Sequence, residues 1–332
     1  MKRVVIPGPR RIGIEEVSEP RREPGEALLR VRYVGICGSD LHTYQGTSPL
    51  VTYPVIPGHE LCCEVIEPEG RFKPGDFVVV EPLLSCGSCY PCRLGRTNCC
   101  EQLKVLGVQI NGGMVEEMAL PESLLHRLPA GADPAFAPLV EMLSIGYHAC
   151  DRGRVEREDK VLVIGAGPIG LGAALVAEER GARVGITDQL ESRLRLSQEL
   201  GIDFVFEAGG EMESRVIDRF GCRPSVVIEA VGNPKTLEQA LEVVSAAGRV
   251  VFVGWTSQSP QWRPDFFLKK ELDLLGSRNS CGIFPDVIDF YCRNLEKLKR
   301  LVTHRFKMEE IETAMHLMSA RDAQTMKVIM EW

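Results

Sequence analysis

The chain has 332 residues, 44% hydrophobic and 26% charged, a composition typical of a globular enzyme large enough for two domains. Its net charge of -7 and the absence of any run of lysine and arginine argue against a nucleic-acid partner, because the phosphate backbone requires a basic surface. The N-terminal segment has no apolar stretch of signal-peptide length, and the longest apolar run, 161–177, is too short and glycine-rich to span a membrane. We therefore expect a cytoplasmic protein with neither nucleic acid nor a membrane as partner.

The N-terminal part of the chain favours short β-strands. Strands are predicted at 27–34 and 77–80, and no long helix is predicted before Leu139. Turn-forming Pro-Gly pairs punctuate the segment, at Pro7, Pro24, Pro57 and Pro74. We expect a mostly β domain over residues 1–141.

Potential metal ligands appear first in the run Gly35-Ile-Cys37-Gly-Ser-Asp-Leu-His, then in Gly58-His59-Glu60, and again at Glu141. Taken singly, each has an ordinary interpretation: Cys37 as a core thiol, His59 as a loop histidine and the two glutamates as surface acids. Together, cysteine, histidine and carboxylate are ligand types of catalytic zinc, which keeps three protein ligands and one exchangeable position.

A second group of cysteines occupies one short segment. Cys86, Cys89, Cys92 and Cys100 stand within fifteen residues, a spacing that lets one loop wrap four thiolates around an ion. Zinc with four protein sulfur ligands has no open position and is structural. Unrelated thiols, disulfides or an iron–sulfur cluster are the alternatives, although the ferredoxin pattern has a shorter last gap and a following proline. Cys99 competes with Cys100 as the fourth ligand.

The apolar run 161–177 reads as strand, turn and helix. The predicted strand 161–164 leads into a glycine-rich turn, and a helix continues to Arg180 before Gly181. In this context the turn is a dinucleotide-binding motif whose glycines admit a pyrophosphate and whose helix N-terminus faces it. Its residues are Gly165, Gly167, Pro168, Ile169 and Gly170.

A second strand, 182–187, ends at Asp188, where a carboxylate can accept both ribose hydroxyls. This acid favours NAD over NADP because it repels a 2′-phosphate, although Arg193 nearby argues the other way. The ordinary alternative is that Asp188 caps a helix beginning near Glu191.

Strands and helices then alternate, which predicts a parallel, doubly wound Rossmann domain. The predicted strands are 203–206, 225–230, 249–253 and 272–275, and the predicted helices are 212–220 and 235–245. We expect an α/β protein with a catalytic domain at 1–141, a nucleotide domain at 142–279 and a return segment at 280–332 that rejoins the catalytic domain.

From Gly25 onward the chain resembles the zinc-containing, medium-chain alcohol and polyol dehydrogenases. The matching motifs, in order, are 35–42, 58–60, the lobe 86–100, Gly112-Gly113, Glu141, and 165–170 with Asp188. The resemblance implies a GroES-like first domain, two zinc ions and NAD per chain, and a homo-oligomer, either dimer or tetramer. The segments 95–100, 276–279 and 303–305 look most like the sugar-acid branch that includes L-galactonate 5-dehydrogenase.

The resemblance also implies the ligands of the catalytic zinc. Cys37 and His59 are two of them, and either Glu60 or Glu141 is the third, with water or a substrate oxygen completing the sphere. Alcohol-type members carry cysteine at the position of Glu141, so the glutamate points to polyols. A carboxylate makes the metal harder and more labile than a thiolate does, which suits substrates with adjacent oxygens.

Further roles follow from the same resemblance. Zinc would acidify a substrate hydroxyl, and the carbon that bears this hydroxyl would deliver hydride to NAD. Ser39 would take the hydroxyl proton, His42 would pass it toward solvent, and Asp40 would orient His59. The ordinary alternatives are a turn hydroxyl for Ser39 and a loop histidine for His42.

Two basic residues complete the predicted site. Arg278 ends the last Rossmann strand, where a guanidinium would suit a carboxylate or phosphate on the substrate, or else form a surface or intersubunit salt bridge. Lys327 lies where relatives often place a basic cofactor contact.

The predicted reaction is hydride transfer from a secondary alcohol of a sugar acid or polyol to NAD, with an L-galactonate-type substrate favoured. The alternatives are a dehydrogenase of a neutral polyol, an inositol or aminocyclitol, or a threonine-like amino alcohol. Departures from the family pattern at Gln109, Met114, Glu117 and Met142 affect the substrate more than the mechanism. A non-catalytic sensor is disfavoured, because every metal ligand, Ser39 and His42 are present.

Overall fold

The computed structural model describes residues 1–262, 264–320 and 324–332. They form two compact units, one of Met1–Glu141 with Phe284–Trp332 and one of Met142–Ile283. We call them the catalytic unit and the nucleotide unit. The predicted α/β architecture, with a mostly β part and a doubly wound part, is confirmed.

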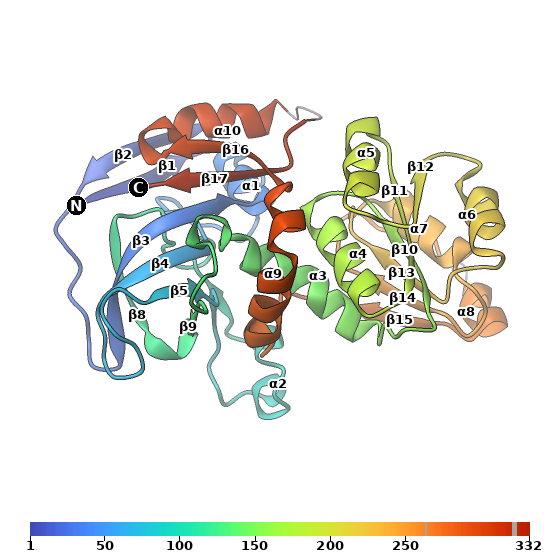
Figure 1. The fold of residues 1–332 in the computed structure, drawn as a ribbon, viewed down its shortest axis with the longest axis horizontal. Helices are drawn as coiled ribbons and strands as arrows, with labels where there is room; N and C mark the ends of the chain where they lie inside the picture. Colours follow the sequence, from blue (N-terminus) through green and yellow to red (C-terminus); the bar gives the residue numbers. More distant parts are fainter. Residues whose placement is uncertain (263, 321–323) are drawn as a thin grey trace. The chain divides into compact units, whose positions relative to one another are not determined.

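The catalytic unit is built on a seven-stranded sheet with the order β16-β17-β3-β4-β5-β9 and with β8 paired to β3 (Figure 1). The strands of this sheet are β3 (Glu26–Ile36), β4 (Glu60–Glu67), β5 (Phe77–Val80), β8 (Glu117–Pro121), β9 (Leu125–Arg127), β16 (Val302–Lys307) and β17 (Lys327–Glu331). Two further pairs form two-stranded sheets: β1 (Lys2–Gly8) with β2 (Arg11–Glu16), and β6 (Leu83–Leu84) with β7 (Lys104–Val105). The return of the chain from the nucleotide unit therefore adds β17 beside β3, and β16 beside β17. Alternating buried side chains such as Leu29, Val31 and Val78 fill its core.

The helices of this unit are short apart from α9. They are α1 (Gly38–Gln45), α2 (Tyr90–Arg93), α9 (Phe284–Lys299) and α10 (Ile311–Ser319), with 3-10 turns η1 (Thr97–Cys99), η2 (Glu122–Leu124), η3 (Pro134–Phe136) and η4 (Met308–Glu310). Helix α10 packs along β2 and β16. Helix α1 was not predicted, because only two apolar side chains fall within its eight residues and the sequence shows no amphipathic pattern there.

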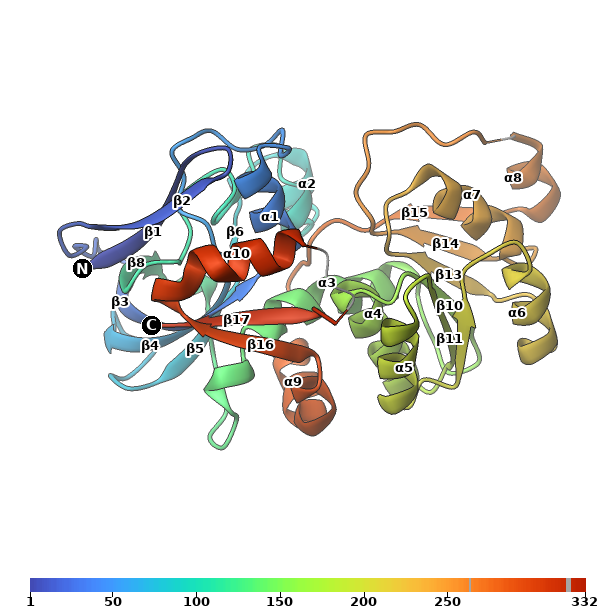
Figure 2. The ribbon, with the colours of Figure 1, turned by 90° about the horizontal axis from the view of Figure 1, so that it is seen from above.

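The nucleotide unit is a parallel six-stranded sheet with the order β12-β11-β10-β13-β14-β15 (Figure 2). Its strands are β10 (Lys160–Ile164), β11 (Arg183–Asp188), β12 (Phe204–Glu207), β13 (Val226–Glu229), β14 (Arg249–Phe252) and β15 (Asp273–Gly276). Its helices are α4 (Pro168–Glu179), α5 (Glu191–Glu199), α6 (Met212–Phe220), α7 (Pro234–Val243) and α8 (Pro264–Lys270), while α3 (Leu139–Arg152) begins in the catalytic unit.

Helices α4 and α5 lie on one side of this sheet and α7 on the other. Strand order reverses between β10 and β13, and ligands of such sheets bind at this point, beyond the carboxyl ends of the strands. Apolar β10 and β13 are buried on both faces, as expected for central parallel strands. Within the described residues, no helix is long and apolar enough to cross a membrane.

Candidate active site and metal centres

The first potential metal centre begins where β3 ends. Cys37 precedes α1, and the buried Asp40 side chain accepts a hydrogen bond of 2.9 Å from the Cys37 backbone N–H. The other oxygen of Asp40 accepts a hydrogen bond of 3.1 Å from the N–H of Gly58. One carboxylate thus caps the helix and ties Cys37 to the loop that carries His59.

Cys37, His59 and Glu60 each offer a ligand atom, and these atoms all lie within 4.8 Å of one another. His59 and Glu60 are buried, and Cys37 is half-buried. Glu60 begins β4 opposite Gly35 of β3. A Cβ at position 35 would lie 2.0 Å from Glu60 Oε2, so a glycine is required there for the carboxylate to reach the cluster.

The charges around this cluster favour a cation. Burial lowers the pKa of His59, but the negative charges of Asp40 and Cys37 outweigh it and hold that pKa well above its usual value. Asp40 Oδ1 lies 3.8 Å from His59 Nδ1, an ionic contact longer than a hydrogen bond. The neighbours that favour a proton on His59 equally favour a divalent metal, which would displace that proton.

Glu141 lies in the first turn of α3 and interacts electrostatically with His59 and Glu60. Burial raises the pKa of the Glu141 carboxyl to about 7, although the positive charges of His59 and Lys327 act in the opposite direction. The structure therefore brings both candidate glutamates near His59, although in the described residues the 4.8 Å cluster consists of Cys37, His59 and Glu60. Which glutamate binds metal stays a prediction.

Ser39 and His42 lie on α1 rather than in the turn or loop of their ordinary interpretations. Ser39 Oγ is buried and has no hydrogen-bond partner among the residues that the structure describes. Buried hydroxyls are nearly always paired, so this atom is suited to a ligand hydroxyl. His42 is exposed, and its Nδ1 lies 3.0 Å from Thr47 Oγ1.

Lys327, at the start of β17, is buried against the same cluster. Its Nζ lies 2.6 Å from both oxygens of Glu60 and 3.3 Å from the carbonyl oxygen of Ile36. The predicted cofactor contact of Lys327 stays a prediction, whereas its contact with Glu60 is a feature of the structure. Sequence reasoning missed this ion pair, because no local pattern connects residues so far apart in the chain.

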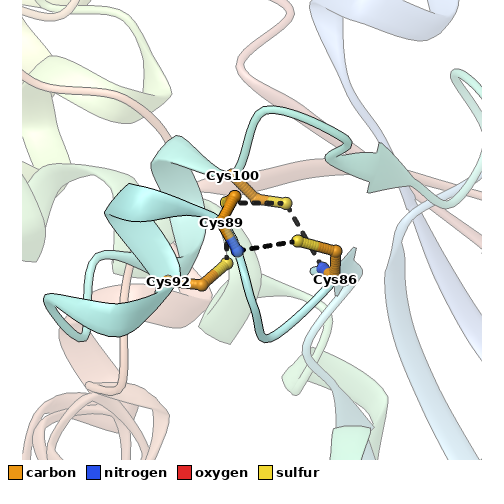
Figure 3. A group of neighbouring side chains, drawn as sticks. All are labelled: Cys86, Cys89, Cys92 and Cys100. Atoms are coloured by element: carbon orange, nitrogen blue, oxygen red, sulfur yellow. Dashed lines mark hydrogen bonds between the residues drawn. The ribbon is translucent and has the colours of Figure 1, made fainter.

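The second centre is the lobe of Cys86, Cys89, Cys92 and Cys100, whose sulfur atoms point toward one another (Figure 3). Cys89 Sγ lies 3.4 Å from Cys92 Sγ and 3.8 Å from Cys100 Sγ. Sulfur atoms at about 2.3 Å from a tetrahedral zinc are about 3.8 Å apart, so the quartet has the size of a zinc site. Cys100, not Cys99, completes the quartet.

Backbone N–H groups stabilise thiolates in this lobe. Those of Cys86 and Gln102 lie 3.3 Å from Cys100 Sγ, and that of Cys89 lies 3.4 Å from Cys86 Sγ. N–H groups of Ser88 and Cys89 lower the pKa of the Cys86 thiol to about 6. Burial raises the pKa of the Cys92 thiol to about 12, so a cation is needed to keep all four ionised together.

In the nucleotide unit the predicted glycine turn joins β10 to α4 at the switch point. Gly165 has a φ of +101°, and a Cβ on Gly170 would lie 1.9 Å from the Gly165 carbonyl oxygen. Gly167 precedes α4, with Pro168 and Ile169 in its first turn. A Cβ there would meet only Arg193 Nη1, at 3.9 Å, so packing within the protein does not explain this glycine, whereas a closely approaching phosphate does.

Asp188 stands at the carboxyl end of β11. Its oxygens accept hydrogen bonds from the N–H groups of Ala166 at 2.8 Å and Leu190 at 2.9 Å. Arg193 Nη1 lies 3.6 Å from Asp188 Oδ2. Asp188 therefore supports both the glycine turn and the start of α5, as its ordinary interpretation proposed, while each oxygen keeps a lone pair for a ribose hydroxyl.

Arg278 follows β15 by two residues and is exposed on the nucleotide unit. Arg278 lies on the same side of the sheet as Asp188 and the glycine turn, because the carboxyl ends of parallel strands all face that side.

Two family models match the chain: an alcohol dehydrogenase GroES-like domain over residues 23–130 and a zinc-binding dehydrogenase over residues 168–293. The chain belongs to the zinc-binding alcohol dehydrogenase family. Like its family, this zinc-binding dehydrogenase is an oxidoreductase that acts on a CH–OH group with NAD or NADP.

Its relatives align with most of the chain. An uncharacterised zinc-type alcohol dehydrogenase-like protein of Haemophilus influenzae is 37% identical over 99% of this chain and 98% of its own. L-galactonate-5-dehydrogenase of Escherichia coli K12 is 37% identical over 77% of this chain and 76% of its own. The structure of an alcohol dehydrogenase (rspB) from Escherichia coli CFT073, complexed with NADH, superimposes with a TM-score of 0.94 at 31% identity, covering 100% and 99% of the two chains.

The donor sets of this zinc-binding dehydrogenase fit two zinc ions of different kinds. The four-thiolate lobe has only protein ligands, whereas Cys37, His59 and Glu60 leave a position for another ligand. Zinc at the second set would polarise a hydroxyl oxygen and stabilise negative charge on it. The chain's own contribution is to hold Cys37, the His59 loop and Glu60 together through Asp40 and Gly35, while the buried Ser39 Oγ has no partner among the described residues.

Proposed function

We propose that this dehydrogenase oxidises a secondary alcohol of a sugar acid or polyol with NAD, and that its substrate is of the L-galactonate type. The observation that carries the proposal is the Cys37, His59 and Glu60 cluster, with the Glu141 carboxyl nearby. A metal held by one thiolate, one imidazole and carboxylate oxygen is harder than one held by two thiolates. Such a site suits a substrate that offers several hydroxyl oxygens.

In this proposal Cys37, His59 and Glu60 hold the metal, and Glu141 is a nearby, exchanging carboxylate. Ser39 Oγ accepts the proton of the substrate hydroxyl and releases its own hydroxyl proton, a relay for which it is suited because Oγ is buried and unpaired among the described residues. His42 carries the proton to solvent, since it lies on the same helix and is exposed. Asp40 positions both Cys37 and the His59 loop through its two backbone hydrogen bonds.

We further propose that NAD is preferred to NADP. The Asp188 carboxylate would repel a 2′-phosphate, and Arg193 beside it partly offsets that repulsion. Asp188→Ala should therefore weaken NAD use and improve NADP use, each by about tenfold or more. Adding Arg193→Ala to that variant should remove the gain with NADP but leave the weak use of NAD. An unchanged preference in Asp188→Ala would contradict this role of the acid.

The acidic part of the substrate is assigned to Arg278. Its guanidinium is exposed near the carboxyl ends of the nucleotide-unit strands, and arginine matches a carboxylate in geometry and charge. The similarity to L-galactonate-5-dehydrogenase supports the same substrate class.

NADH formation at 340 nm tests the proposal. Purified protein with measured zinc content would be assayed against aldonic acids, polyols, inositols and threonine. We expect the highest kcat/KM with an aldonic acid, and Arg278→Ala should raise KM for acids while leaving neutral polyols unchanged. Arg195→Ala, which removes an exposed arginine that pairs with Glu191, is the matched control. An equal loss of kcat/KM on acidic and neutral substrates in Arg278→Ala would contradict recognition of the acid by Arg278.

The oligomeric state is a separate proposal. Strand β15 lies at an edge of the nucleotide-unit sheet, so its outer N–H and C=O groups can pair with a second copy. We propose a homo-oligomer, either dimer or tetramer, and light scattering after size-exclusion chromatography measures it directly.

A further inference from the structure

The buried ion pair of Lys327 and Glu60 lies directly beside the proposed catalytic metal ligands. The side chains of Lys327 and Glu60 are only 4% and 1% exposed. Both Glu60 oxygens are 2.6 Å from Nζ, and the carbonyl oxygen of Ile36 takes a third contact. These contacts account for the three N–H groups of the ammonium, which leaves none for a cofactor phosphate.

The sheet builds this pair from three strands. Glu60 begins β4, Lys327 begins β17, and β3 lies between them and pairs with both. Gly35 of β3 leaves space for the carboxylate, since a Cβ there would overlap Glu60 Oε2. The geometry is therefore fixed by backbone pairing rather than by flexible loops.

A need for stability alone explains this pair poorly. Taking two charges out of water is costly, and apolar residues of similar volume often serve as well or better in a core. Here, moreover, the cation lies beside a cluster that must attract a divalent metal. An ammonium at this place opposes the metal's charge and competes with it for the same two oxygens.

We propose that Lys327 is a positioning residue that holds the Glu60 carboxylate in a two-oxygen ion pair and thereby keeps it a weak, exchangeable ligand of the catalytic metal. The inference rests on the proposed function for the identity of the site, and on no particular substrate. Glu60 remains close enough to Cys37 and His59 to contribute a ligand oxygen, but its charge is already shared with Lys327. The open position that the substrate needs thus lies beside a carboxylate that is not firmly bound.

The rate of zinc release to a chromogenic chelator tests the proposal without any substrate. The parent protein should release its two zinc ions in two kinetic phases. Cys37→Ser lacks the catalytic zinc, so its single phase is release from the four-cysteine lobe, and the other phase of the parent protein is release from the catalytic site. In Lys327→Met the Glu60 carboxylate loses its competing cation, so catalytic zinc should leave at least about tenfold more slowly. The cobalt-substituted variant should show a changed visible spectrum, because Glu60 then binds the metal more firmly.

A double variant separates a role through Glu60 from a general disturbance. In Lys327→Met with Glu60→Gln both charges are absent, and the slow release should disappear. Lys327→Arg, which keeps the cation, should behave like the parent protein. Lys270→Met is the matched control, since Lys270 donates to three carbonyl oxygens in the nucleotide unit and should leave zinc release unchanged.

Release from Lys327→Met that is unchanged or faster would overturn the proposal, as would slow release that persists in the double variant. If Lys327→Met instead weakens NAD binding and leaves zinc release unchanged, Lys327 is a cofactor contact and the positioning role is wrong. If Lys327→Met does not fold, Lys327→Arg and Glu60→Gln are measured instead. The proposal then requires zinc release from Lys327→Arg at the parent rate and faster zinc release from Glu60→Gln. If the parent protein is inactive on the whole substrate panel but the variants show the expected zinc release rates, the proposed substrate is contradicted and the role of Lys327 is not.

Discussion

The two potential metal centres of the catalytic unit are built in opposite ways. The lobe draws Cys86, Cys89, Cys92 and Cys100 from one short segment that contains only the brief helices α2 and η1. The Cys37, His59 and Glu60 cluster draws its ligands from the ends of β3 and β4, and β17 brings Lys327 against it from the far end of the chain. In the first centre the metal would order the loop, whereas in the second the sheet orders the ligands.

This difference separates stability from catalysis. A loop with little core of its own depends on its ion, because metal binding supplies folding free energy. Ligands held by buried hydrogen bonds and strand pairing are already arranged, so their ion contributes mainly chemistry. Changes at the two centres should therefore affect different measurements.

The largest expected effect on activity is at Cys37. Cys37→Ser removes a thiolate ligand, and because zinc provides several kcal/mol of charge stabilisation, kcat/KM should fall by about 10³-fold or more. Zinc content should decrease from about two ions to about one per chain, with little change in Tm. A Cys37→Ser protein that keeps both zinc ions and its activity would erase the distinction drawn between the centres.

The complementary change is in the lobe. Cys100→Ser should also lose about one zinc ion per chain, but here Tm should fall by about 5 °C or more, because the loop loses its cross-link. Cys99→Ser is the matched control, since Cys99 is adjacent in sequence and lies outside the quartet. Differential scanning fluorimetry and metal analysis measure both properties. Equal effects of the two substitutions would show that the fourth ligand is not Cys100.

A smaller effect on activity is expected at Ser39. Ser39→Ala should lower kcat by about 10²-fold or more if the hydroxyl accepts the substrate proton, while zinc content and NAD affinity stay unchanged. His42→Ala should cost less, because His42 is exposed and water can replace it as the proton carrier. A Ser39→Ala protein with unchanged kcat would return Ser39 to its ordinary interpretation as a structural hydroxyl.

The smallest effect concerns stability and uses a buried acid away from both centres. Glu122 accepts hydrogen bonds of 2.8 to 3.1 Å from the backbone N–H groups of Glu69, Gly70 and Arg71. Burial alone would raise the pKa of Glu122, but these donors hold it below its usual value. Glu122→Gln should therefore reduce the free energy of unfolding by about 2 kcal/mol at pH 7.

The sign of the pH dependence follows from that lowered pKa. Glu122 stabilises the fold above the pKa of the unfolded carboxyl and loses this contribution as pH falls through its folded pKa. The difference between Glu122→Gln and the parent protein should accordingly shrink as the pH is lowered below about 4. Urea unfolding at pH 7 and at about pH 3 measures it, with zinc content as a control for both metal centres. A difference that grows in acid would contradict the assignment.

Much of the nucleotide unit was predictable, because strong local patterns recur along it. The predicted helix 212–220 coincides with α6, and the predicted strand 249–253 differs from β14 by one residue. The short helix α1 was not predictable in the same way. Its start is fixed by the Asp40 carboxylate on the Cys37 backbone, a contact that hydrophobic periodicity does not reveal.

The sequence by itself determined the metal-binding character of the cysteine lobe and the phosphate-binding character of the glycine turn. In both, the functional groups lie within about fifteen residues, so spacing alone limits their geometry. Tertiary structure decided what spacing left open: that Cys100 and not Cys99 joins the quartet, and that Lys327 pairs with Glu60 across 267 residues. The reason is physical, because strand order and register, not local conformation, decide which distant side chains meet in a buried site.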